Sequence, residues 1–500
     1  MKKLPEIAEA AGIAAIVFYP LYAGLLENVA AVRMHSSAPV TNFALAIIAN
    51  LVFMAVVLSL LQSWISEKRK AAWLRPCLPC IVVSSLSEMV YIQIVHQPSR
   101  RLLVGVFLLT LVFTLILRKK SQRSYEGALG LCKAALVGLG VFSIFVTLQL
   151  AHLALWRPAP DFIDGKSTAS VYPSGSHPRV VWILMDELSY NQVFGQRVPD
   201  LELPYFDAFR QTSTLFTDVQ PATEDTETAV PSLLLGRLVD HVTYTSANRY
   251  LAAAPGQTLR PFPASETPFA LAQRQGMTTS VIGWYNPYCT MLAPYLNQCY
   301  WNSNAEFPAT FIMGDGFWRS VTDVWVRYWI ALDPHHKRRG LIYMADAYRD
   351  LTQRAEEQFA QSQPDFVFIH LPLPHPPGFY DRRTGQFDAS GQRSYLDNLV
   401  LADKTLGQLV SVLQASPRWS NTSIVLCGDH SWRTMMWRQT RHWTSEDEAV
   451  SHGGIFDPRP MLMVHQPGQH TPRTVSQPFP LVGVHDILDS QILSQQPSIQ

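Results

Sequence analysis

Long apolar stretches fill the first third of the chain, whereas the remainder alternates short apolar runs with polar segments. Each long stretch approaches the ~20 residues that a helix needs to cross the hydrocarbon core of a bilayer. The pattern predicts an N-terminal α-helical membrane domain over residues 1–155, with about five transmembrane helices. The apolar stretches cover about residues 8–30, 41–63, 77–97, 101–117 and 130–155.

Basic residues in the connections between these stretches predict the orientation of the membrane domain. The N-terminus, the cluster at residues 67–70 and the cluster at residues 118–123 alternate with weakly charged connections. Positively charged connections remain in the cytoplasm, so an odd number of spans places everything after residue 155 outside. We therefore expect a multi-pass membrane protein with an extracytoplasmic C-terminal domain. The arginine pair at residues 100–101 falls in an outer connection and departs from this pattern.

The region after the membrane domain divides into a linker, a folded domain and a tail. Residues 156–178 are rich in Pro, Ser and Gly without periodicity, as in a linker. Residues 179–490 alternate strand-like with helix-like runs, which predicts an α/β domain with a central, largely parallel sheet. Residues 491–500 are expected to form a polar tail. Strand-like runs occur at residues 180–185, 279–284, 366–370, 424–426 and 460–464, and a helix-like run occurs at 394–413.

Composition narrows the class of protein. The formal net charge of +1 over 500 residues offers no basic surface for a polyanion, so no nucleic-acid partner is expected. The six cysteines are too few for a disulfide scaffold. Cys289 and Cys299 bracket a short loop and could form a disulfide in an oxidising compartment. The sequence leaves that pairing open.

Acidic and imidazole side chains follow two of the expected strands. Asp186 and Glu187 end one apolar run, and Asp429 and His430 end another. The C-terminal ends of the strands form the ligand-binding edge of an open α/β sheet. Carboxylate oxygens with an imidazole nitrogen suit Zn²⁺, with Mn²⁺ or another divalent cation as the alternative. Asp186 could instead cap a helix, and Glu187 could point away because side chains alternate along an extended chain.

A hydroxyl-rich loop precedes an expected helix in the α/β region. Thr226 lies just before Pro231 and the apolar run Leu233–Leu235, near a helix N-terminus, where backbone N–H groups and the helix dipole favour an anion. A hydroxyl activated by a bound dication can attack phosphorus. Thr223 and Thr228 compete with Thr226 for this role, and Thr226 could instead be a helix cap.

These residues, taken in order along the chain, resemble the alkaline phosphatase/sulfatase superfamily. Within it they resemble the membrane-anchored phosphoethanolamine and phosphoglycerol transferases, the lipid A and lipoteichoic acid enzymes. The resemblance covers roughly residues 179–490. The matching pieces are Asp186 after a strand, Thr226 with Gly236-Arg237, His375-Pro-Pro, Gly428-Asp429-His430 and His452-Gly453.

The resemblance implies a role for each residue near the metal. Thr226 would be the nucleophile, carrying a phosphothreonine intermediate, and would ligate the metal together with Asp186, Glu187, Asp429 and His430. Sulfatases need Cys or Ser at the nucleophile position to make formylglycine. Because this chain has Thr226 there, a formylglycine sulfatase is disfavoured.

Three histidines complete the expected site. The resemblance implies that His375 and His452 are catalytic and bind substrate. His375 would contact the phosphoryl group or protonate the leaving group, and His452 would be a second phosphate contact or a ligand of a second metal. The prolines that flank His375 restrict its backbone and hold the imidazole on a rigid loop. His370 would contact the substrate or lie buried behind the residues that do.

The expected function is that of a membrane-bound, metal-dependent transferase. It would move phosphoethanolamine or phosphoglycerol from a phospholipid donor to a cell-envelope glycan or glycolipid, and tethering beside the membrane would raise the effective concentration of the donor. A phosphate or sulfate ester hydrolase would use the same site with water as acceptor. A non-catalytic membrane protein with a degenerate domain is the alternative of another class, and failure to bind metal would favour it.

Overall fold

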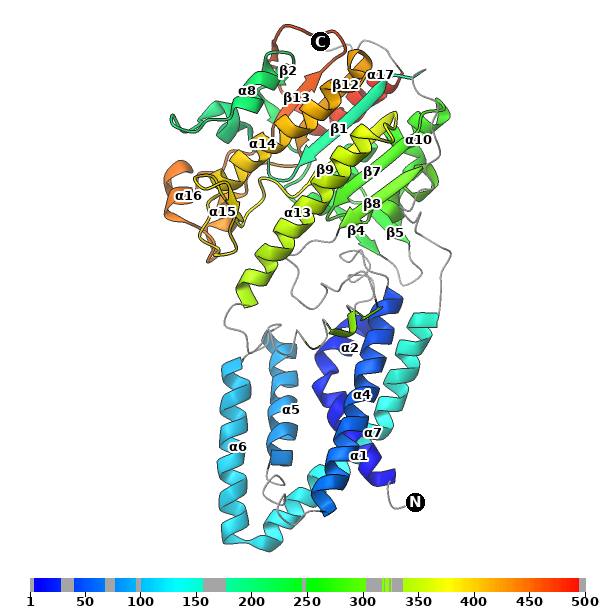
Figure 1. The fold of residues 1–500 in the computed structure, drawn as a ribbon, viewed down its shortest axis with the longest axis vertical. Helices are drawn as coiled ribbons and strands as arrows, with labels where there is room; N and C mark the ends of the chain where they lie inside the picture. Colours follow the sequence, from blue (N-terminus) through cyan, green and yellow to red (C-terminus); the bar gives the residue numbers. More distant parts are fainter. Residues whose placement is uncertain are drawn as a thin grey trace. The chain divides into compact units, whose positions relative to one another are not determined.

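The computed structural model shows two compact units (Figure 1). The helical unit comprises Met1–Val32, Ala38–Arg157 and Pro308–His336, and the α/β unit comprises Arg33–Ser37, Pro158–Phe307 and Lys337–Gln500. The structure describes residues 4–27, 40–67, 77–95, 100–155, 177–244, 249–302, 317–318, 320–322, 325 and 336–493.

The helical unit confirms the expected helical N-terminal region. Three of its described helices contain segments long and apolar enough to cross a membrane: Val40–Trp64, Leu102–Lys120 and Gln122–Leu155. Its helices are α1 (Leu4–Val17), α2 (Tyr19–Glu27), α4 (Val40–Glu67), α5 (Cys77–Val95), α6 (Arg100–Lys120) and α7 (Gln122–Leu155).

Two of the expected spans differ from a single long apolar helix. The first is divided into α1 and α2, because Pro20 in the first turn of α2 has no backbone N–H with which to continue α1. In α5 the apolar segment covers only Pro79–Tyr91.

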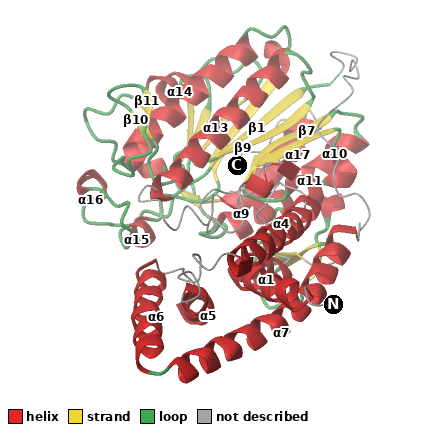
Figure 2. Ribbon diagram, turned by 60° about the horizontal axis from the view of Figure 1, so that its bottom comes forward, coloured by secondary structure: helices red, strands yellow, loops and turns green. Residues whose placement is uncertain are grey.

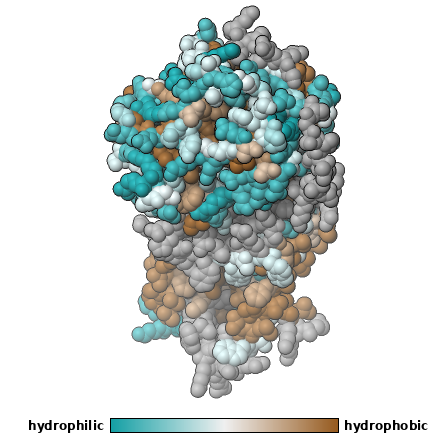
Figure 3. Space-filling view, turned by 45° about the horizontal axis from the view of Figure 1, so that its top comes forward, coloured by the Kyte–Doolittle hydropathy of each residue, from teal (hydrophilic) through white to brown (hydrophobic). Residues whose placement is uncertain are grey.

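The described surface of the helical unit is largely hydrophobic, whereas that of the α/β unit is mainly hydrophilic (Figure 3).

Glycines allow α1 and α7 to pack closely. A Cβ atom built at Gly12 would lie 2.0 Å from the carbonyl oxygen of Leu136, and one built at Gly140 would lie 1.9 Å from the carbonyl oxygen of Ala8. Only glycine at these positions permits this backbone approach, which is the way small residues bring membrane helices together.

A segment from the middle of the sequence also belongs to the helical unit. The Trp325 ring packs edge-on against Phe18 and Phe53, with centroid distances of 5.7 and 6.3 Å. The Asn50 side chain donates to the carbonyl oxygen of Val321 over 3.2 Å. The sequence assigned this segment to a continuous domain over residues 179–490. The structure differs because the Trp325 side chain packs against Phe18, between α1 and α2, and against Phe53 of α4.

The α/β unit is built on an eight-stranded sheet of order β14-β2-β13-β12-β1-β9-β7-β8. Neighbours from β12 to β8 are parallel, while β13 runs antiparallel to both β12 and β2, which confirms the expected largely parallel sheet. The strands are β1 (Arg179–Met185), β2 (Thr214–Phe216), β7 (Thr279–Trp284), β8 (Gln298–Asn302), β9 (Phe366–Leu371), β12 (Thr422–Gly428), β13 (Leu462–His465) and β14 (Arg473–Val475).

Helices cover both faces of this sheet, with α13 and α14 on one side and α10 and α17 on the other (Figures 1 and 2). Every residue of β1, β9 and β12 is buried, as expected for apolar parallel strands between two helical layers. The helices are α8 (Pro204–Arg210), α9 (Thr226–Leu235), α10 (Pro268–Arg274), α11 (Tyr288–Met291), α13 (His336–Ala360), α14 (Tyr395–Gln414), α15 (Thr434–Trp437), α16 (Ser445–Val450) and α17 (Val484–Ile492).

Smaller elements border the main sheet. A disulfide joins Cys289 of α11 to Cys299 of β8, which answers the question that the sequence left open. The short strands are β3 (Val219–Gln220), β4 (His241–Tyr244), β5 (Tyr250–Ala253), β6 (Arg260–Pro261), β10 (Tyr380–Asp381), β11 (Gln386–Phe387) and β15 (Phe479–Pro480).

The register of the central strands determines where the site forms. Met185, the last residue of β1, pairs with Gly428 of β12 on one side and with Leu371 of β9 on the other. The residues that follow Met185 and Gly428 therefore lie together at the carboxyl edge of the sheet. Ligands of open α/β sheets bind at this edge.

Candidate metal centre

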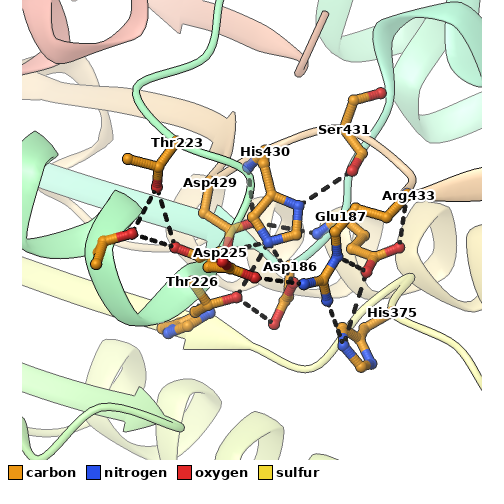
Figure 4. A network of polar contacts seen from close by, with 12 residues as sticks. Asp186, Glu187, Thr223, Asp225, Thr226, His375, Asp429, His430, Ser431 and Arg433 are labelled. Carbon is orange, nitrogen blue, oxygen red and sulfur yellow. Dashed lines mark hydrogen bonds and ion pairs between the residues drawn. The ribbon is translucent and has the colours of Figure 1, made fainter. Parts of the chain in front are cut away.

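Asp186 and Asp429 emerge side by side at the carboxyl edge of the sheet (Figure 4). Both side chains are buried. The backbone N–H groups of Glu187 and His430 donate to Oδ1 of Asp429 over 3.1 and 2.9 Å. The Nε2 atom of His430 lies 3.8 Å from Oδ1 of Asp186 and 3.3 Å from Oδ2 of Asp429. The structure thus gathers two carboxylates and an imidazole at one point.

Thr226 points into the same cluster from the first residue of α9. Its Oγ1 lies 3.3 Å from Oδ2 of Asp186 and 3.2 Å from Nε2 of His430. The helix begins there because Asp225 has an extended backbone, and it ends at Gly236 in the left-handed conformation. The hydroxyl therefore lies at the N-terminus of a helix, where the dipole favours negative charge.

The competing hydroxyls make different contacts. Thr223 and Thr228 lie 2.8 Å apart, oxygen to oxygen, and each donates to the carbonyl oxygen of Asp225. These bonds hold Thr223, in the loop before α9, and Thr228, in the first turn of α9, against the backbone of Asp225. Of the three hydroxyls, Thr226 is the one that contacts Asp186 and His430.

Glu187 is turned toward different partners from its neighbour Asp186. Its backbone is left-handed, with φ of 60°, and its carboxylate accepts from Arg433 Nε at 2.7 Å and Trp437 Nε1 at 2.9 Å. Burial alone would raise the pKa of Glu187, but Arg433, His375, His430 and the Trp437 hydrogen bond together lower it below its ordinary value. This carboxylate is therefore held ionised and well bonded.

Arg433 connects several groups near Thr226. Besides Glu187, its guanidinium donates to Oδ1 of Asp225 over 3.0 Å and lies 3.4 Å from Nε2 of His375. Burial lowers the pKa of this guanidinium, but Glu187 and then Asp186 raise it above the usual range. Arg433 and Trp437 are not among the site residues expected from the sequence, and the available signal is their position just after Asp429-His430.

His375 and His370 are both buried near this network. His375 follows β9, and its Nε2 lies 3.8 Å from Oε1 of Glu187. His370 lies inside β9, with its Nδ1 2.7 Å from the hydroxyl of Tyr288. Burial lowers the pKa of each imidazole to about 4, so both are neutral at pH 7.

His452 comes from a different part of the α/β unit. It is exposed on the turn that follows α16, with a left-handed backbone of φ 51°. No hydrogen bond or ion pair within the described ranges joins its side chain to Asp186, Thr226 or Asp429. Substrate binding by His452 therefore stays a prediction, since the described contacts do not connect its side chain with these three residues.

The cluster suits a divalent cation. Single ligand atoms from Asp186, Asp429 and His430 lie within 4.8 Å of one another, and Asp186, Glu187 and His375 form a second such group. Oδ2 of Asp429 is buried without a hydrogen bond, and burying adjacent carboxylates is costly unless a cation accompanies them. In the first group, His430 and His370 lower the pKa of Asp429 below its ordinary value although burial alone would raise it. Carboxylates, an imidazole and the Thr226 hydroxyl together form an appropriate donor set.

Comparison with protein families identifies the α/β unit. A family model described as Sulfatase matches residues 178–453. The chain belongs to the sulfatase family. The matched range begins just before β1 and ends just after α16, so it contains every expected site residue from Asp186 to His452.

Sulfatase-family membership makes this chain a metal-dependent enzyme of the alkaline phosphatase/sulfatase superfamily. Similar solved structures include Ps i-CgsB in complex with k-i-k-neocarrahexaose (14% identity, 64% of this chain, 73% of that chain, TM-score 0.41). Others are the phosphonate monoester hydrolase of Agrobacterium radiobacter (15%, 64%, 78%, 0.37) and the lipoteichoic acid synthase LtaP from Listeria monocytogenes (13%, 68%, 77%, 0.39). Such low identities concern the fold alone. No curated protein matches the sequence.

Proposed function

We propose that this sulfatase-family enzyme is a membrane-anchored transferase that forms a covalent intermediate on Thr226. It moves a phosphoryl-linked group, phosphoethanolamine or phosphoglycerol, from a phospholipid to a cell-envelope glycan or glycolipid. The observation that carries the proposal is the Thr226 hydroxyl, 3.3 Å from Asp186 and 3.2 Å from His430 at a helix N-terminus. Because Thr cannot become formylglycine, a direct attack of this hydroxyl on phosphorus fits the site better than sulfatase chemistry.

Each side chain has a distinct task in this proposal. Asp186, Asp429 and His430 would hold the cation, and Zn²⁺ suits these donors best. Glu187 and His375 form a second group of possible ligands with Asp186. When bound, the cation would lower the pKa of the Thr226 hydroxyl and neutralise charge on the phosphoryl oxygens. Oδ2 of Asp186 is placed to accept the Thr226 proton. The α9 N-terminus and Arg433 provide the positive field that an anionic substrate requires.

His375 is the residue best placed to assist the leaving lipid alcohol. It is neutral, buried and 3.4 Å from the Arg433 guanidinium. One imidazole N–H can hydrogen-bond the departing oxygen while the ring is held near Glu187. The bond between phosphorus and the lipid oxygen breaks as Thr226 Oγ1 bonds to phosphorus, and the lipid oxygen takes up a proton from water. An acceptor hydroxyl then attacks phosphorus and loses its proton to water, the P–Oγ1 bond breaks, and the proton held by Asp186 returns to Thr226. His370 packs against the same Trp284 ring as His375 and so helps to hold it. His452 would contact a bulky substrate.

The apolar helices and the disulfide support a cellular location for the enzyme. Three apolar helices would anchor the chain in the bacterial inner membrane beside its lipid donor. The disulfide between Cys289 and Cys299 supports an oxidising compartment, hence a periplasmic α/β unit.

The experiment that tests this proposal is intact-mass analysis and peptide mapping of the protein purified from growing cells, beside Thr226→Ala. We expect an adduct on Thr226 that is absent from the variant, with a mass that names the transferred group. Absence of both the adduct and bound metal would contradict the proposal.

The sulfatase-family match supports hydrolysis as a second candidate function. A phosphate or sulfate ester hydrolase would use the same residues with water in place of the acceptor hydroxyl. Turnover that is unaffected by any added glycan acceptor would favour it over transfer.

A further inference from the structure

One loop between β7 and β8 reaches several residues of the site. It begins at Gly283 within β7 and runs through Tyr285, which has a left-handed backbone with φ of 72°. A non-glycine residue persists in that conformation only when its surroundings hold it there. The loop ends at Cys289 in α11.

Asn286 fastens this loop to the residue that carries the nucleophile. Its side-chain amide donates to the carbonyl oxygen of Thr226 over 3.2 Å, and the side chain is only 1% exposed. The reverse orientation of the amide would place its oxygen against the carbonyl oxygen, so the direction of this bond is determined. Because the bond restrains the backbone of Thr226, it also restrains where Oγ1 lies relative to Asp186 and His430.

The same loop supports the two buried histidines. The hydroxyl of Tyr288 lies 2.7 Å from Nδ1 of His370. The Trp284 ring packs edge-on against His370 and His375, with centroid distances of 5.7 and 5.5 Å. A Cβ atom on Gly283 would lie 2.1 Å from the Tyr288 ring. The ring therefore packs directly against the backbone of β7.

A covalent bond secures the far end of the loop. Cys289 follows Tyr288 directly and is joined to Cys299 in β8, the edge strand that pairs in parallel with β7. Both cysteines are buried. The disulfide therefore ties α11 to the sheet a few residues from the side chains that contact Thr226 and His370.

We propose that residues 283–289 form a positioning element in which Asn286 orients Thr226 and the Cys289–Cys299 disulfide keeps the loop in place. Asn286 is a positioning residue, because it acts through the backbone of Thr226. Activity consequently depends on the oxidised state of this cysteine pair. The inference rests on Thr226 being the nucleophile, as the proposed function holds.

The test uses the full-length protein in detergent with a chromogenic phosphodiester, bis(p-nitrophenyl) phosphate, as probe. Asn286→Ala should lower kcat about 10- to 100-fold with KM nearly unchanged, since small misplacements of a reacting group have effects of this size. Asn286→Asp keeps the shape but loses the donor and should behave like Asn286→Ala. In Asn286→Ala, metal content and the melting temperature should stay close to those of the wild type, whereas Asn286→Asp also buries a carboxylate and should lower the melting temperature.

Asn297→Ala is the matched control. Asn297 accepts from the backbone N–H and hydroxyl of Thr279 at the opposite end of β7, over 2.9 and 3.0 Å. Its loss removes comparable hydrogen bonds from the same strand without touching the site. We expect a lower melting temperature with unchanged kcat. Equal losses of kcat in Asn286→Ala and Asn297→Ala would overturn the positioning role.

The cysteine pair is tested by replacing both residues with serine and, independently, by treating the wild type with a thiol reductant. Both should lower kcat, and adding Asn286→Ala to the serine pair should cause little further loss, because the two changes displace the same loop. Fully additive losses, or wild-type activity after demonstrated reduction, would contradict the coupling. If the serine pair does not fold, reduction and reoxidation of the wild type decide the matter.

Thr226→Ala separates failure of this inference from failure of the proposed function. Full turnover by Thr226→Ala, or none by the wild type, would overturn both. An inactive Thr226→Ala together with a fully active Asn286→Ala would overturn the positioning role alone.

Discussion

At the scale of single residues, the site consists of buried charges whose partners come from distant parts of the chain. Asp186 and Asp429 are fully buried beside His430. Glu187 is equally buried but is paired with Arg433. Two neighbouring acids, Asp186 and Glu187, thus have different surroundings, and a change at either one has a distinct expected result.

Replacing Asp429 with Asn should abolish tight metal binding. The variant keeps the shape but loses the charge of one ligand, and even indirect supports of a metal site are worth about 10- to 100-fold in affinity, so removal of a ligand should exceed this. The measurement is metal content after dialysis against a chelator. Asp346→Asn, which removes an exposed acid on α13, is the control. Unchanged metal content in Asp429→Asn would exclude the cluster as the metal site.

Replacing Arg433 with Ala should destabilise the α/β unit by about 3 kcal/mol, because it leaves Glu187 buried without its ion pair. The Trp437 hydrogen bond remains and limits the loss. Thermal unfolding measures the effect. Adding Glu187→Gln to Arg433→Ala should recover much of the melting temperature by removing the unpaired charge, whereas equal melting temperatures for the single and double variants would contradict this account.

At the scale of elements, a side chain of one helix can bond to the free backbone N–H groups at the start of another. Asp403 in α14 accepts the backbone N–H of Phe206, in the first turn of α8, over 2.7 Å. The ring of Tyr205 lies against Gly407 of the same helix, where a Cβ atom would be 2.2 Å from it. The close contact of α8 with α14 therefore depends on one buried carboxylate and one glycine.

Asp403 should make stability depend on pH. Burial raises its pKa to about 6 from its ordinary 3.8. The folded protein therefore binds this proton more tightly than the unfolded chain, so the contribution is greatest at low pH and is lost as pH rises through about 6. Relative to wild type, Asp403→Asn should gain melting temperature between about pH 4 and pH 7. A difference that does not change with pH would contradict this assignment.

The contact between α1 and α7 should tolerate no side chain at Gly140. Gly140→Val would place carbon atoms on the carbonyl of Ala8, so the two helices must separate. Gly138→Val on the same helix is the control, since nothing lies within 4 Å of a Cβ atom there. Thermal stability of the full-length protein in detergent should fall for Gly140→Val only. A similar loss in both variants would indicate a general effect of valine in α7.

At the scale of the whole molecule, the charge pattern of the connections predicts a topology. A reporter that is active only in the periplasm should be active when fused after residue 500 and inactive when inserted at residues 118–123. Thiol-specific labelling of single cysteines in intact cells checks the same assignment. The reverse pattern would place the α/β unit in the cytoplasm and remove the phospholipid donor leaflet from its reach.

Local patterns predict much of the architecture. The long apolar runs identify α4, α6 and α7, because bilayer thickness sets a minimum length that is visible in the sequence. The runs that end in Asp186 and Asp429 identify β1 and β12, because strands buried on both faces are continuously apolar. The hydroxyl-rich loop before Pro231 and the apolar run Leu233–Leu235 predict the helix α9, since helix starts have local signals.

Other features depend on contacts between residues far apart in the chain. Arg433 reaches Glu187 across 246 positions, and Asn286 reaches Thr226 across 60. Neither pairing has a local signal, because each is created by the order of strands in the sheet. Likewise, Trp325 joins the helical unit because of the side chains it meets there.

The sequence by itself determined the two kinds of unit, the strands that bear acids and the family of the enzyme, since periodicity, length and motif order are properties of consecutive residues. Only the tertiary structure decided which acid faces the cluster and which pairs with an arginine. It also decided which hydroxyl meets Asp186 and His430, and which loop donates a hydrogen bond to the backbone of Thr226. Those outcomes depend on strand register and backbone direction, which arise only when separate parts of the chain pack together.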